Sequence, residues 1–288
     1  MFSRSEIVRF ADCDTAGAMY FPRFLEAVND LTEAWFRDGL GVDFHTFHLV
    51  HNCGVPVVNT RVEALAPCRL GETLELSLAL ESIGRSSLVM DIRGTAGGAV
   101  RLRVRHKVVF ISLEHYHAIA IPGELRGPIE RYRVPGAEPS AEPQSIEPAV
   151  PAQAFRARQT VHTSHCDPAG IVFYPRVFEM LCSAQEEWFE HAIGWPYGGA
   201  LRAAGLAVRT RVATVEFVRV SRLSDHLDID LWLLDCGDAG FTAALATSCS
   251  GELRLKARLE CEFVAPGGAA APPVPAALLE RMRRFLPG

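Results

Sequence analysis

The amino-acid sequence predicts an α+β protein built from two tandem domains, each an antiparallel sheet wrapped around one long helix. Three observations predict this fold class. The first half of the 288-residue chain aligns with the second half without a gap. In each half, a stretch with helical hydrophobic periodicity is followed by stretches in which apolar and polar residues alternate. Between the halves lies a segment rich in proline, glutamate and alanine, which is typical of a linker.

The internal repeat is clearest around two similar loops. Residues 8–26 read VRFADCDTAGAMYFPRFLE and residues 161–179 read VHTSHCDPAGIVFYPRVFE, an offset of 167 − 14 = 153 residues. The same offset pairs Trp35 with Trp188. Solenoid and propeller repeats recur at roughly 20 to 50 residues, so this longer offset indicates duplication of a whole domain.

The domain boundaries follow from the repeat and from local composition. We expect domain 1 at residues 1–132, a linker at 133–154 and domain 2 at 155–288. The linker has almost no large apolar residue and should be extended and semi-rigid. A short last helix is expected around Pro275, and Pro128 should interrupt or kink its counterpart in domain 1.

One long helix is expected early in each domain. Pro22 and Pro175 stand where such a helix can begin, because proline in the first turn loses no hydrogen bond. Glycines mark the expected ends of the helices: Gly39, Gly41 and Gly194. Apolar residues recur every three or four positions and should face the core: Leu25, Val28, Leu31 and Trp35, then Val177, Leu181, Ala184 and Trp188.

After the helix the hydrophobic period changes to two. Leucines alternate with other residues at 74–80, and apolar residues do so at 227–233. Other runs typical of strands follow at 87–93, 100–111, 241–248 and 253–264. Because these strands are mostly consecutive, they favour an antiparallel sheet around the helix over alternating βαβ units.

Composition excludes several classes of protein. A net charge of −5 and a pI near 6.1 argue against a generic nucleic-acid binder. The first residues contain no apolar signal segment and no apolar run is long enough for a membrane span, so we expect a cytoplasmic protein. The eight cysteines form no CxxC pair and should be reduced thiols. No metal site is expected, because His45, His48 and His51 lack a further ligand.

The loop before each helix carries the clearest chemical signal. It contains Cys-Asp-Thr-Ala-Gly at 13–17 and Cys-Asp-Pro-Ala-Gly at 166–170. A lone aspartate two residues before Ala-Gly is typical of an Asx turn or a helix cap. The eleven-residue frame, repeated directly before a helix, instead favours a catalytic role for Asp14, for Asp167 or for both.

The frame HCDPAGIVFYP at 165–175 resembles the signature of the 4-hydroxybenzoyl-CoA thioesterase family, a hotdog-fold group that acts on acyl-CoA. The frame DCDTAGAMYFP at 12–22 is similar with more changes, and the segments beginning at Gly54 and Ile121 also resemble the family. The resemblance implies two hotdog domains and hydrolysis of an acyl-CoA to an acid and CoA. No cofactor is expected beyond the coenzyme A of the substrate, because no metal-ligand cluster or phosphate-cradling loop is present.

The resemblance also implies roles for single residues. Asp14 and Asp167 match the family's catalytic aspartate, while Phe21 and Tyr174 match the residue whose backbone N–H faces the thioester carbonyl. N–H groups at a helix start, together with the positive end of the helix dipole, stabilise an oxygen that becomes anionic. The carboxylate could act as nucleophile or as general base, and both routes stay open.

Further residues are expected to contact the substrate. Basic side chains at alternate positions project from one face of a strand, where they could hold CoA phosphates or form a solvated sheet face. The turn 84–87 is basic, whereas its counterpart 237–240 is acidic. The expected substrate or CoA contacts are Gly17, Gly170, Arg85, Arg103, Arg105, Lys256 and Arg258.

In single-domain relatives each site lies between two subunits, so the resemblance implies that the two halves pair within the chain; further homo-oligomerisation is left open. It also implies one better composite site, which uses Asp167 and Arg85. Glu26 and Glu179, one turn inside the helices, are either second carboxylates of the site or surface ion pairs with a nearby arginine. Glu63 and Glu216 are left unassigned.

Two other functions compete with thioester hydrolysis. A hotdog hydratase or dehydratase usually pairs a histidine with an acid on the helix or its preceding loop. The first expected helix contains no histidine, and the second contains none before His191, near its end. A non-catalytic acyl-CoA-binding protein would be expected to carry an output domain, for which no stretch is left over. The acyl group, aromatic or aliphatic, stays open.

Overall fold

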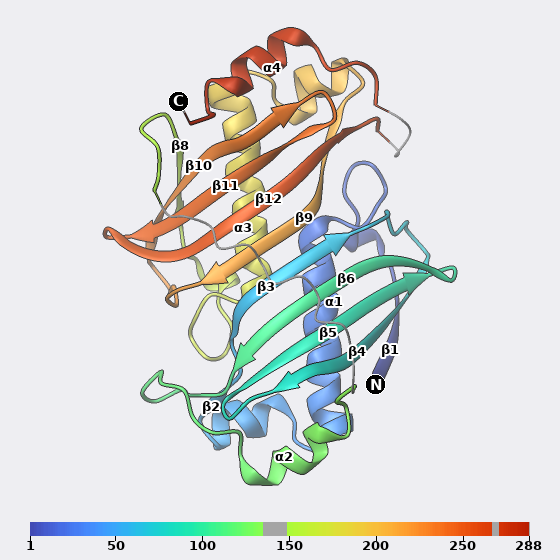
Figure 1. Ribbon diagram of the computed structural model, residues 1–288, viewed down its shortest axis with the longest axis vertical. Coiled ribbons are helices and arrows are strands. Elements are labelled where there is room, and N and C mark those ends of the chain that lie inside the picture. The colour runs from blue at the N-terminus through green and yellow to red at the C-terminus, as the bar shows by residue number, and fades with distance from the viewer. Residues whose placement is uncertain (135–148, 267–270, 288) are drawn as a thin grey trace. The chain divides into compact units, whose positions relative to one another are not determined.

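The computed structural model describes residues 1–134, 149–266 and 271–287. The chain divides into two compact units, Met1–Pro143 and Gln144–Gly288 (Figure 1). Their boundary falls inside the expected linker, of which residues 135–148 lie outside the described residues.

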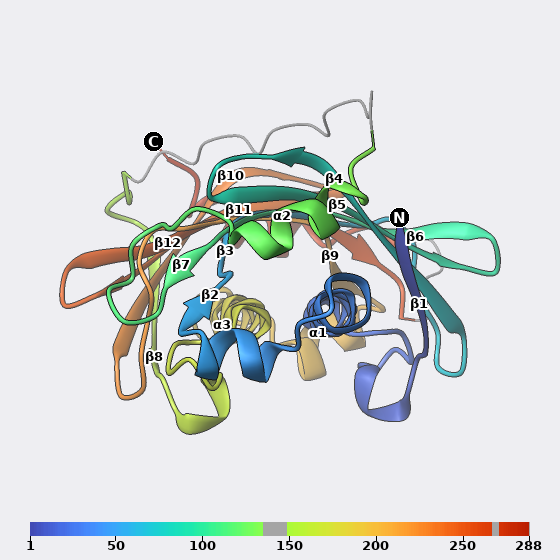
Figure 2. The ribbon, with the colours of Figure 1, turned by 90° about the horizontal axis from the view of Figure 1, so that it is seen from below.

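Unit 1 packs the helix α1 (Phe21–Ala34) against one face of an antiparallel sheet (Figure 2). Its strands lie in the order β1-β4-β5-β6-β3. Their bounds are Phe2–Ile7 for β1, Val57–Ala64 for β3, Thr73–Ile83 for β4, Ser87–Ala96 for β5 and Ala99–Val109 for β6. The unit also contains a small sheet of β2 (Cys53–Gly54) with β7 (Ile111–Ser112), and the helix α2 (Gly123–Glu130).

Unit 2 repeats this arrangement around the helix α3 (Tyr174–Glu187). Its strands lie in the order β9-β12-β11-β10-β8. Their bounds are Phe155–Thr160 for β8, Ala207–Phe217 for β9, His226–Gly237 for β10, Gly240–Cys249 for β11 and Glu252–Val264 for β12. A last helix, α4, covers Ala276–Arg283. Both units therefore have the predicted α+β hotdog fold.

The duplication extends to irregularities in the sheets. The register between β4 and β5 shifts at Leu80/Ser82, and that between β10 and β11 shifts at the equivalent Leu233/Asp235. A second pair of shifts, at Gly94/Thr95 and Thr247/Ser248, is likewise equivalent. Bulges redirect a strand and are features of a fold rather than accidents. Their recurrence at the repeat offset supports the duplication of one complete domain.

The apolar stripe predicted on each helix forms part of the core. Leu25, Val28 and Leu31 are fully buried, and Leu181 and Ala184 are at most 1% exposed. Burial of a leucine side chain stabilises a fold by roughly 1.5–3 kcal/mol. The stripe therefore explains why these residues form helices that lie against their sheets.

Each long helix continues for one wide turn before it ends. The π-type turns are η2 (Trp35–Leu40) and η5 (Trp188–Ile193). Gly41 and Gly194 follow them with φ values of 80° and 71°, the left-handed conformation of a helix C-cap. The prediction that these glycines end the helices is confirmed, whereas Gly39 lies inside η2.

Two other expectations concern Pro128 and the membrane. Pro128 was expected to interrupt or kink α2; the interruption is wrong, because this helix runs on to Glu130, and the kink stays a prediction. Proline at this position removes one N–H donor and crowds the carbonyl one turn earlier, and in this helix of eight residues the chain keeps its helical course. Within the described ranges, no helix has the length and apolarity that crossing a membrane requires.

Candidate functional site

The loop that leads into α1 is shaped by Asp14. Its backbone N–H donates to the Ala18 carbonyl oxygen over 2.8 Å, and its Oδ1 accepts the N–H of Ala16 over 2.8 Å. Gly17 donates its N–H to the Asp14 carbonyl oxygen over 3.0 Å and has a φ of 75°. Only glycine adopts such a φ without strain, so Gly17 is required by the turn itself.

Unit 2 builds the same loop from Asp167. Its N–H donates to the Ile171 carbonyl oxygen over 3.0 Å, and its Oδ1 accepts the N–H of Ala169 over 2.9 Å. Gly170 donates to the Asp167 carbonyl oxygen over 2.9 Å and has a φ of 77°. Asp167 is half-buried, whereas Asp14 is exposed. The loops thus share one geometry but expose their carboxylates to different degrees.

This geometry reconciles two predictions for the aspartates. Each one forms the Asx turn expected of an aspartate in this position. In both loops the turn hydrogen bond is accepted by Oδ1 of the carboxylate. A structural role and a catalytic role are therefore compatible.

The start of α3 follows this loop directly. Phe173 is the N-cap and Tyr174 is the first helical residue. Pro175 has no N–H to donate, and the Arg176 N–H donates to the Phe173 carbonyl oxygen over 2.9 Å. Tyr174, which the family resemblance implicates through its backbone N–H, is thus placed at the first position of the helix. In α1 the equivalent residues are Tyr20, Phe21, Pro22 and Arg23.

The neighbouring cysteines are unsuited to nucleophilic attack. Burial, and then the nearby Asp167 carboxylate, raise the pKa of the Cys166 thiol. Burial and the carboxylates of Asp12 and Asp14 raise the pKa of Cys13 in the same way. The thiolate is the reactive form of cysteine, so these thiols are inert at neutral pH.

The helix glutamates form ion pairs with arginines one turn earlier. Glu26 contacts Arg23 over 2.5 Å and Glu179 contacts Arg176 over 2.6 Å, and all four side chains are half-buried. This is the simpler of the two readings of these glutamates, and it places a salt bridge beside each helix start.

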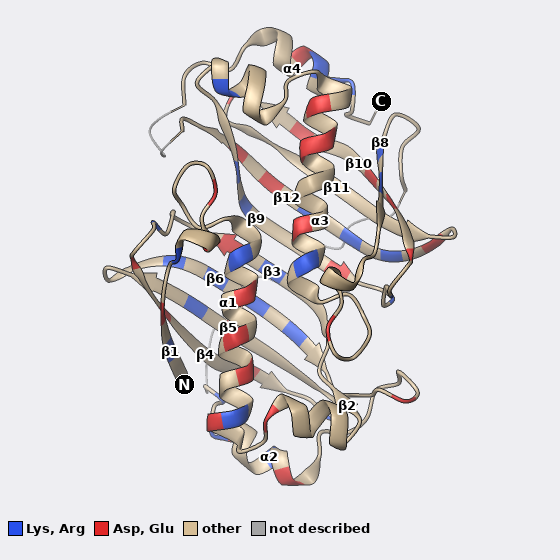
Figure 3. Cartoon of the chain, turned by 180° about the vertical axis from the view of Figure 1, so that it is seen from behind, with Lys and Arg blue, Asp and Glu red and all other residues tan. Residues whose placement is uncertain are grey.

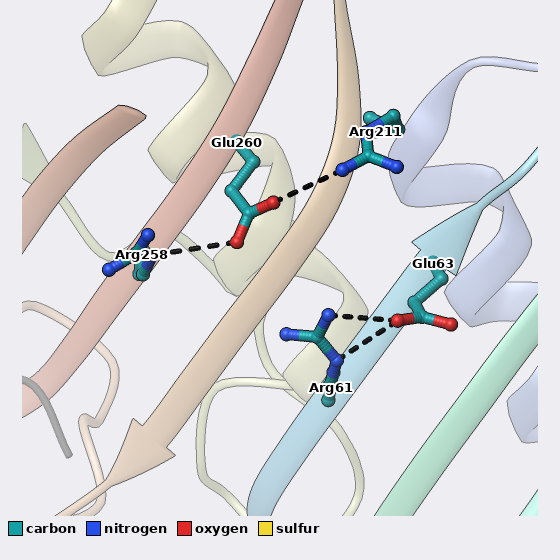
Figure 4. Close-up of polar contacts among 5 residues, drawn as sticks. All are labelled: Arg61, Glu63, Arg211, Arg258 and Glu260. Atoms are coloured by element: carbon teal, nitrogen blue, oxygen red, sulfur yellow. Dashed lines mark hydrogen bonds and ion pairs between the residues drawn. The ribbon is translucent and has the colours of Figure 1, made fainter. Parts of the chain in front are cut away.

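The predicted basic stripes lie on the sheet face opposite the helix. Arg105 makes a bidentate contact with Glu81, with both distances 3.0 Å. Lys256 pairs with Glu216 over 3.8 Å, and Arg258 with Glu260 over 3.5 Å. Figure 4 shows the contacts of Glu260 with Arg258 and Arg211, and the separate contact of Arg61 with Glu63. Figure 3 shows acidic and basic residues interspersed on the strands of each unit.

These pairs favour the reading of the stripes as a solvated sheet face. Arg103, by contrast, is exposed and makes no ion pair with any described residue. Phosphate binding by this stripe stays a prediction, and Arg103 is the member best able to serve it.

Arg85 lies far from the Asp14 loop within unit 1. That loop follows β1, whose last residue, Ile7, pairs with Thr73 at the start of β4. Arg85 follows the other end of β4, which roughly 33 Å of strand separates from the first. Arg126 donates to the Gly84 carbonyl oxygen over 3.2 Å and so adds a second cation at this turn. Arg85 and Asp14 therefore do not form one site.

Before each aspartate loop, a side chain accepts a hydrogen bond from the backbone N–H three residues earlier. We call this hydrogen bond the brace of the loop; the sequence did not predict it. The His162 N–H donates to Nδ1 of His165 over 3.0 Å, and the Arg9 N–H donates to Oδ2 of Asp12 over 2.8 Å. His165 and Asp12 are equivalent in the repeat, but their different residue types conceal the shared role. Both are hydrogen-bond acceptors, which is the feature that could have identified them.

Unit 2 also contains a cavity of about 350 Å³ beside this brace. It is lined by His162 and His165, by Arg176 and Glu179 from α3, and by Gln159 from β8.

Three histidines, for which the sequence predicts no metal site, lie in and directly after one turn of unit 1. His45 and His48 lie in the π-type turn η3 (His45–Val50), where Nδ1 of His48 contacts the Phe44 carbonyl oxygen over 2.9 Å. Over the described part of the chain, no three His, Cys, Asp or Glu side chains are grouped as metal ligands. No disulfide joins any of the eight cysteines.

Sequence comparison identifies relatives for parts of the chain. The 1,4-dihydroxy-2-naphthoyl-CoA hydrolase of Synechococcus elongatus is 28% identical over 88 residues, which are 30% of this chain and 64% of that protein. The chain thus spans slightly less than two thirds of this relative. The hydrolase of the same name from Synechocystis is 23% identical over 128 residues, 44% of this chain and 88% of that protein.

Structural comparison and a family profile cover more of the chain. The 12:0-ACP thioesterase from Umbellularia californica is similar in fold, with a TM-score of 0.72 and 14% identity over 91% of this chain and 94% of that one. The profile of the thioesterase-like superfamily matches residues 8–129 and, separately, residues 161–282. The two matches coincide with the two hotdog units, and together they show that the chain belongs to the thioesterase-like superfamily.

Proposed function

We propose that the protein is an acyl-CoA thioesterase that uses Asp167, and less efficiently Asp14, to hydrolyse an acyl-CoA. One observation carries the proposal. In a member of the thioesterase-like superfamily, each unit holds an aspartate in an Asx turn directly before the start of a buried helix. This arrangement combines a carboxylate with backbone N–H groups and the positive end of a helix dipole.

The reaction replaces the carbonyl–sulfur bond of the thioester with a carbonyl–oxygen bond. As the carbonyl is attacked, its oxygen gains negative charge, which the N–H of Tyr174 or Phe21 and the helix dipole stabilise. In one route the aspartate attacks, CoA leaves as a thiolate, and water hydrolyses the mixed anhydride. In the other, the aspartate takes a proton from water, which attacks directly. Both routes consume one water and yield the free acid and CoA.

Names of relatives support an aromatic acyl group. The sequence relatives are named for 1,4-dihydroxy-2-naphthoyl-CoA, an aromatic acyl-CoA. We extend this to a proposal that the chain accepts aromatic acyl-CoA, as a cytoplasmic enzyme that needs neither metal nor nucleotide cofactor. Pairing of the two units within the chain is part of the same proposal.

A thiol-release assay with purified protein and a panel of aromatic, short-chain and long-chain acyl-CoAs tests this function. We expect aromatic substrates to have the highest kcat/KM, and EDTA dialysis to leave the rate unchanged. Binding of acyl-CoA without release of thiol would instead indicate a non-catalytic binding protein. Hydration of an enoyl-CoA without thiol release would indicate a hydratase.

A further inference from the structure

The loop that carries Asp167 is closed at its base by His165. The Nδ1 atom of His165 accepts the N–H of His162 over 3.0 Å, and the His165 N–H donates back to the His162 carbonyl oxygen over 2.9 Å. The His165 carbonyl oxygen then accepts the N–H of Phe173, the N-cap of α3, over 2.9 Å. One residue thus ties the loop to the segment that follows β8 and to the helix start.

Unit 1 has the same brace with a different acceptor. Oδ2 of Asp12 accepts the Arg9 N–H over 2.8 Å, and the Asp12 N–H donates to the Arg9 carbonyl oxygen over 3.1 Å. The Asp12 carbonyl oxygen accepts the N–H of Tyr20, the N-cap of α1, over 2.8 Å. A carboxylate keeps its acceptor oxygens down to about pH 4, whereas a histidine gains a proton near neutral pH.

The surroundings of His165 allow it to exchange protons with solvent. It lines the cavity of about 350 Å³ and is half-buried. His162 lies on its own turn, with the ring centroids 5.6 Å apart. From α3 the cavity is faced by Arg176, Glu179 and Glu187, and from β8 by the uncharged Gln159 and Thr160.

We propose that His165 is a positioning residue whose neutral imidazole holds the Asp167 loop in its working shape, so that protonation of His165 switches off this site alone. The proposal rests on the proposed thioesterase function. Protonation places a hydrogen on Nδ1, which then faces the His162 N–H as a second donor. The hydrogen bond is lost and the base of the loop opens. The Asp14 loop is unaffected, because its equivalent hydrogen bond is accepted by a carboxylate and not by an imidazole.

The sign of the effect follows from the direction of the pKa. Burial, then the nearby His162, hold the pKa of His165 below the ordinary histidine value of 6.5, although Glu179 acts in the opposite direction. The folded loop therefore prefers the neutral imidazole. The brace is complete above pH 6.5 and is lost as pH falls through the lowered pKa.

Single-site variants test the proposal by their pH profiles. Asp14→Asn leaves the site of Asp167, and its kcat/KM should fall about tenfold per pH unit below the pKa of His165. Asp167→Asn leaves the site of Asp14, which should show no such fall until the carboxylate range. Adding His165→Asp to Asp14→Asn should restore activity at acidic pH, because it installs the acceptor of unit 1.

A matched control is His191→Gln in the Asp14→Asn background. His191 is an exposed histidine near the end of the same helical segment, and its replacement should leave the acid fall in place. The proposal is overturned by an equal fall in both single-site backgrounds, or by a fall that persists in the His165→Asp variant.

Amide hydrogen exchange on the wild-type protein separates this inference from the proposed function. Protection of the His162 amide, corrected for the intrinsic rate, should be constant above pH 6.5 and fall below it, while that of Arg9 stays constant. Such a result without any thioesterase activity would support the brace and reject the enzyme function. Constant protection of His162 over this range would reject the brace, whatever the activity.

Discussion

The N–H of Ala169 donates to Oδ1 of Asp167 over 2.9 Å, so the carboxylate proposed for catalysis also shapes the loop that presents it. Substitutions can separate these two roles. Asparagine keeps an oxygen acceptor for the Ala169 N–H but has no negative charge. Alanine removes both the acceptor and the charge.

We therefore expect Asp167→Asn to lower kcat by roughly a hundredfold or more, in line with loss of a nucleophile or general base. Its melting temperature should stay close to that of the wild type. Asp167→Ala should lose the same activity and, in addition, about 1 kcal/mol of stability with the turn hydrogen bond. Thermal denaturation and thiol release, measured on both variants, check this. An active Asp167→Asn would leave Asp167 with a structural role alone.

The two sites should contribute unequally to turnover. Asp167 is half-buried and is followed by Pro168, which stiffens its loop, whereas Asp14 is exposed and is followed by Thr15. A small displacement of the carboxylate from the substrate carbonyl can lower the rate of hydrolysis strongly. Asp14→Asn should therefore lower total kcat several-fold at most, and the double variant should be inactive. Equal losses of about half in each single variant would show two equivalent sites.

Arg85 should contribute to the binding of coenzyme A rather than to chemistry. It is an exposed cation in a turn to which Arg126 adds a second positive charge. Arg85→Ala should raise KM several-fold with kcat unchanged, and should weaken the dependence of KM on salt. The equivalent residue in unit 2 is Asp238, so Asp238→Arg should lower KM where Arg85→Ala raises it. A fall in kcat without a change in KM would contradict a binding role.

Sequence periodicity was sufficient for the main elements of the fold. The helical stripe through Leu25 and Leu31 and the alternation at 74–80 each placed a buried face correctly. The turns that continue the helices after Trp35 and Trp188 could not be predicted, because their π-type hydrogen bonding has no distinct hydrophobic period.

The candidate site was predictable only where both copies keep the same residues. Asp14 and Asp167 stand in one repeated frame, and their loops have one geometry. Arg105 and Glu81 are 24 positions apart, so their ion pair depends on strand register that alternation alone does not give. The roles of His165 and Asp12 were not predicted for a different reason. Both accept a backbone N–H, and this shared contact depends on the conformation of the loop backbone.

The last prediction concerns the stability of unit 1 in acid. His106 is 2% exposed, and burial lowers its pKa to about 3 from the ordinary value of 6.5. The neutral imidazole is thus the folded form, so its contribution is complete above pH 6.5 and declines by about 1.4 kcal/mol per pH unit as pH falls toward 3. The equivalent residue in unit 2 is Leu259, which does not titrate. His106→Leu should therefore reduce the fall in melting temperature between about pH 8 and 4.5, and Leu259→His should enlarge it. Calorimetry across this range checks both variants. If the melting temperature of His106→Leu falls as much as that of the wild type, other groups govern the acid dependence.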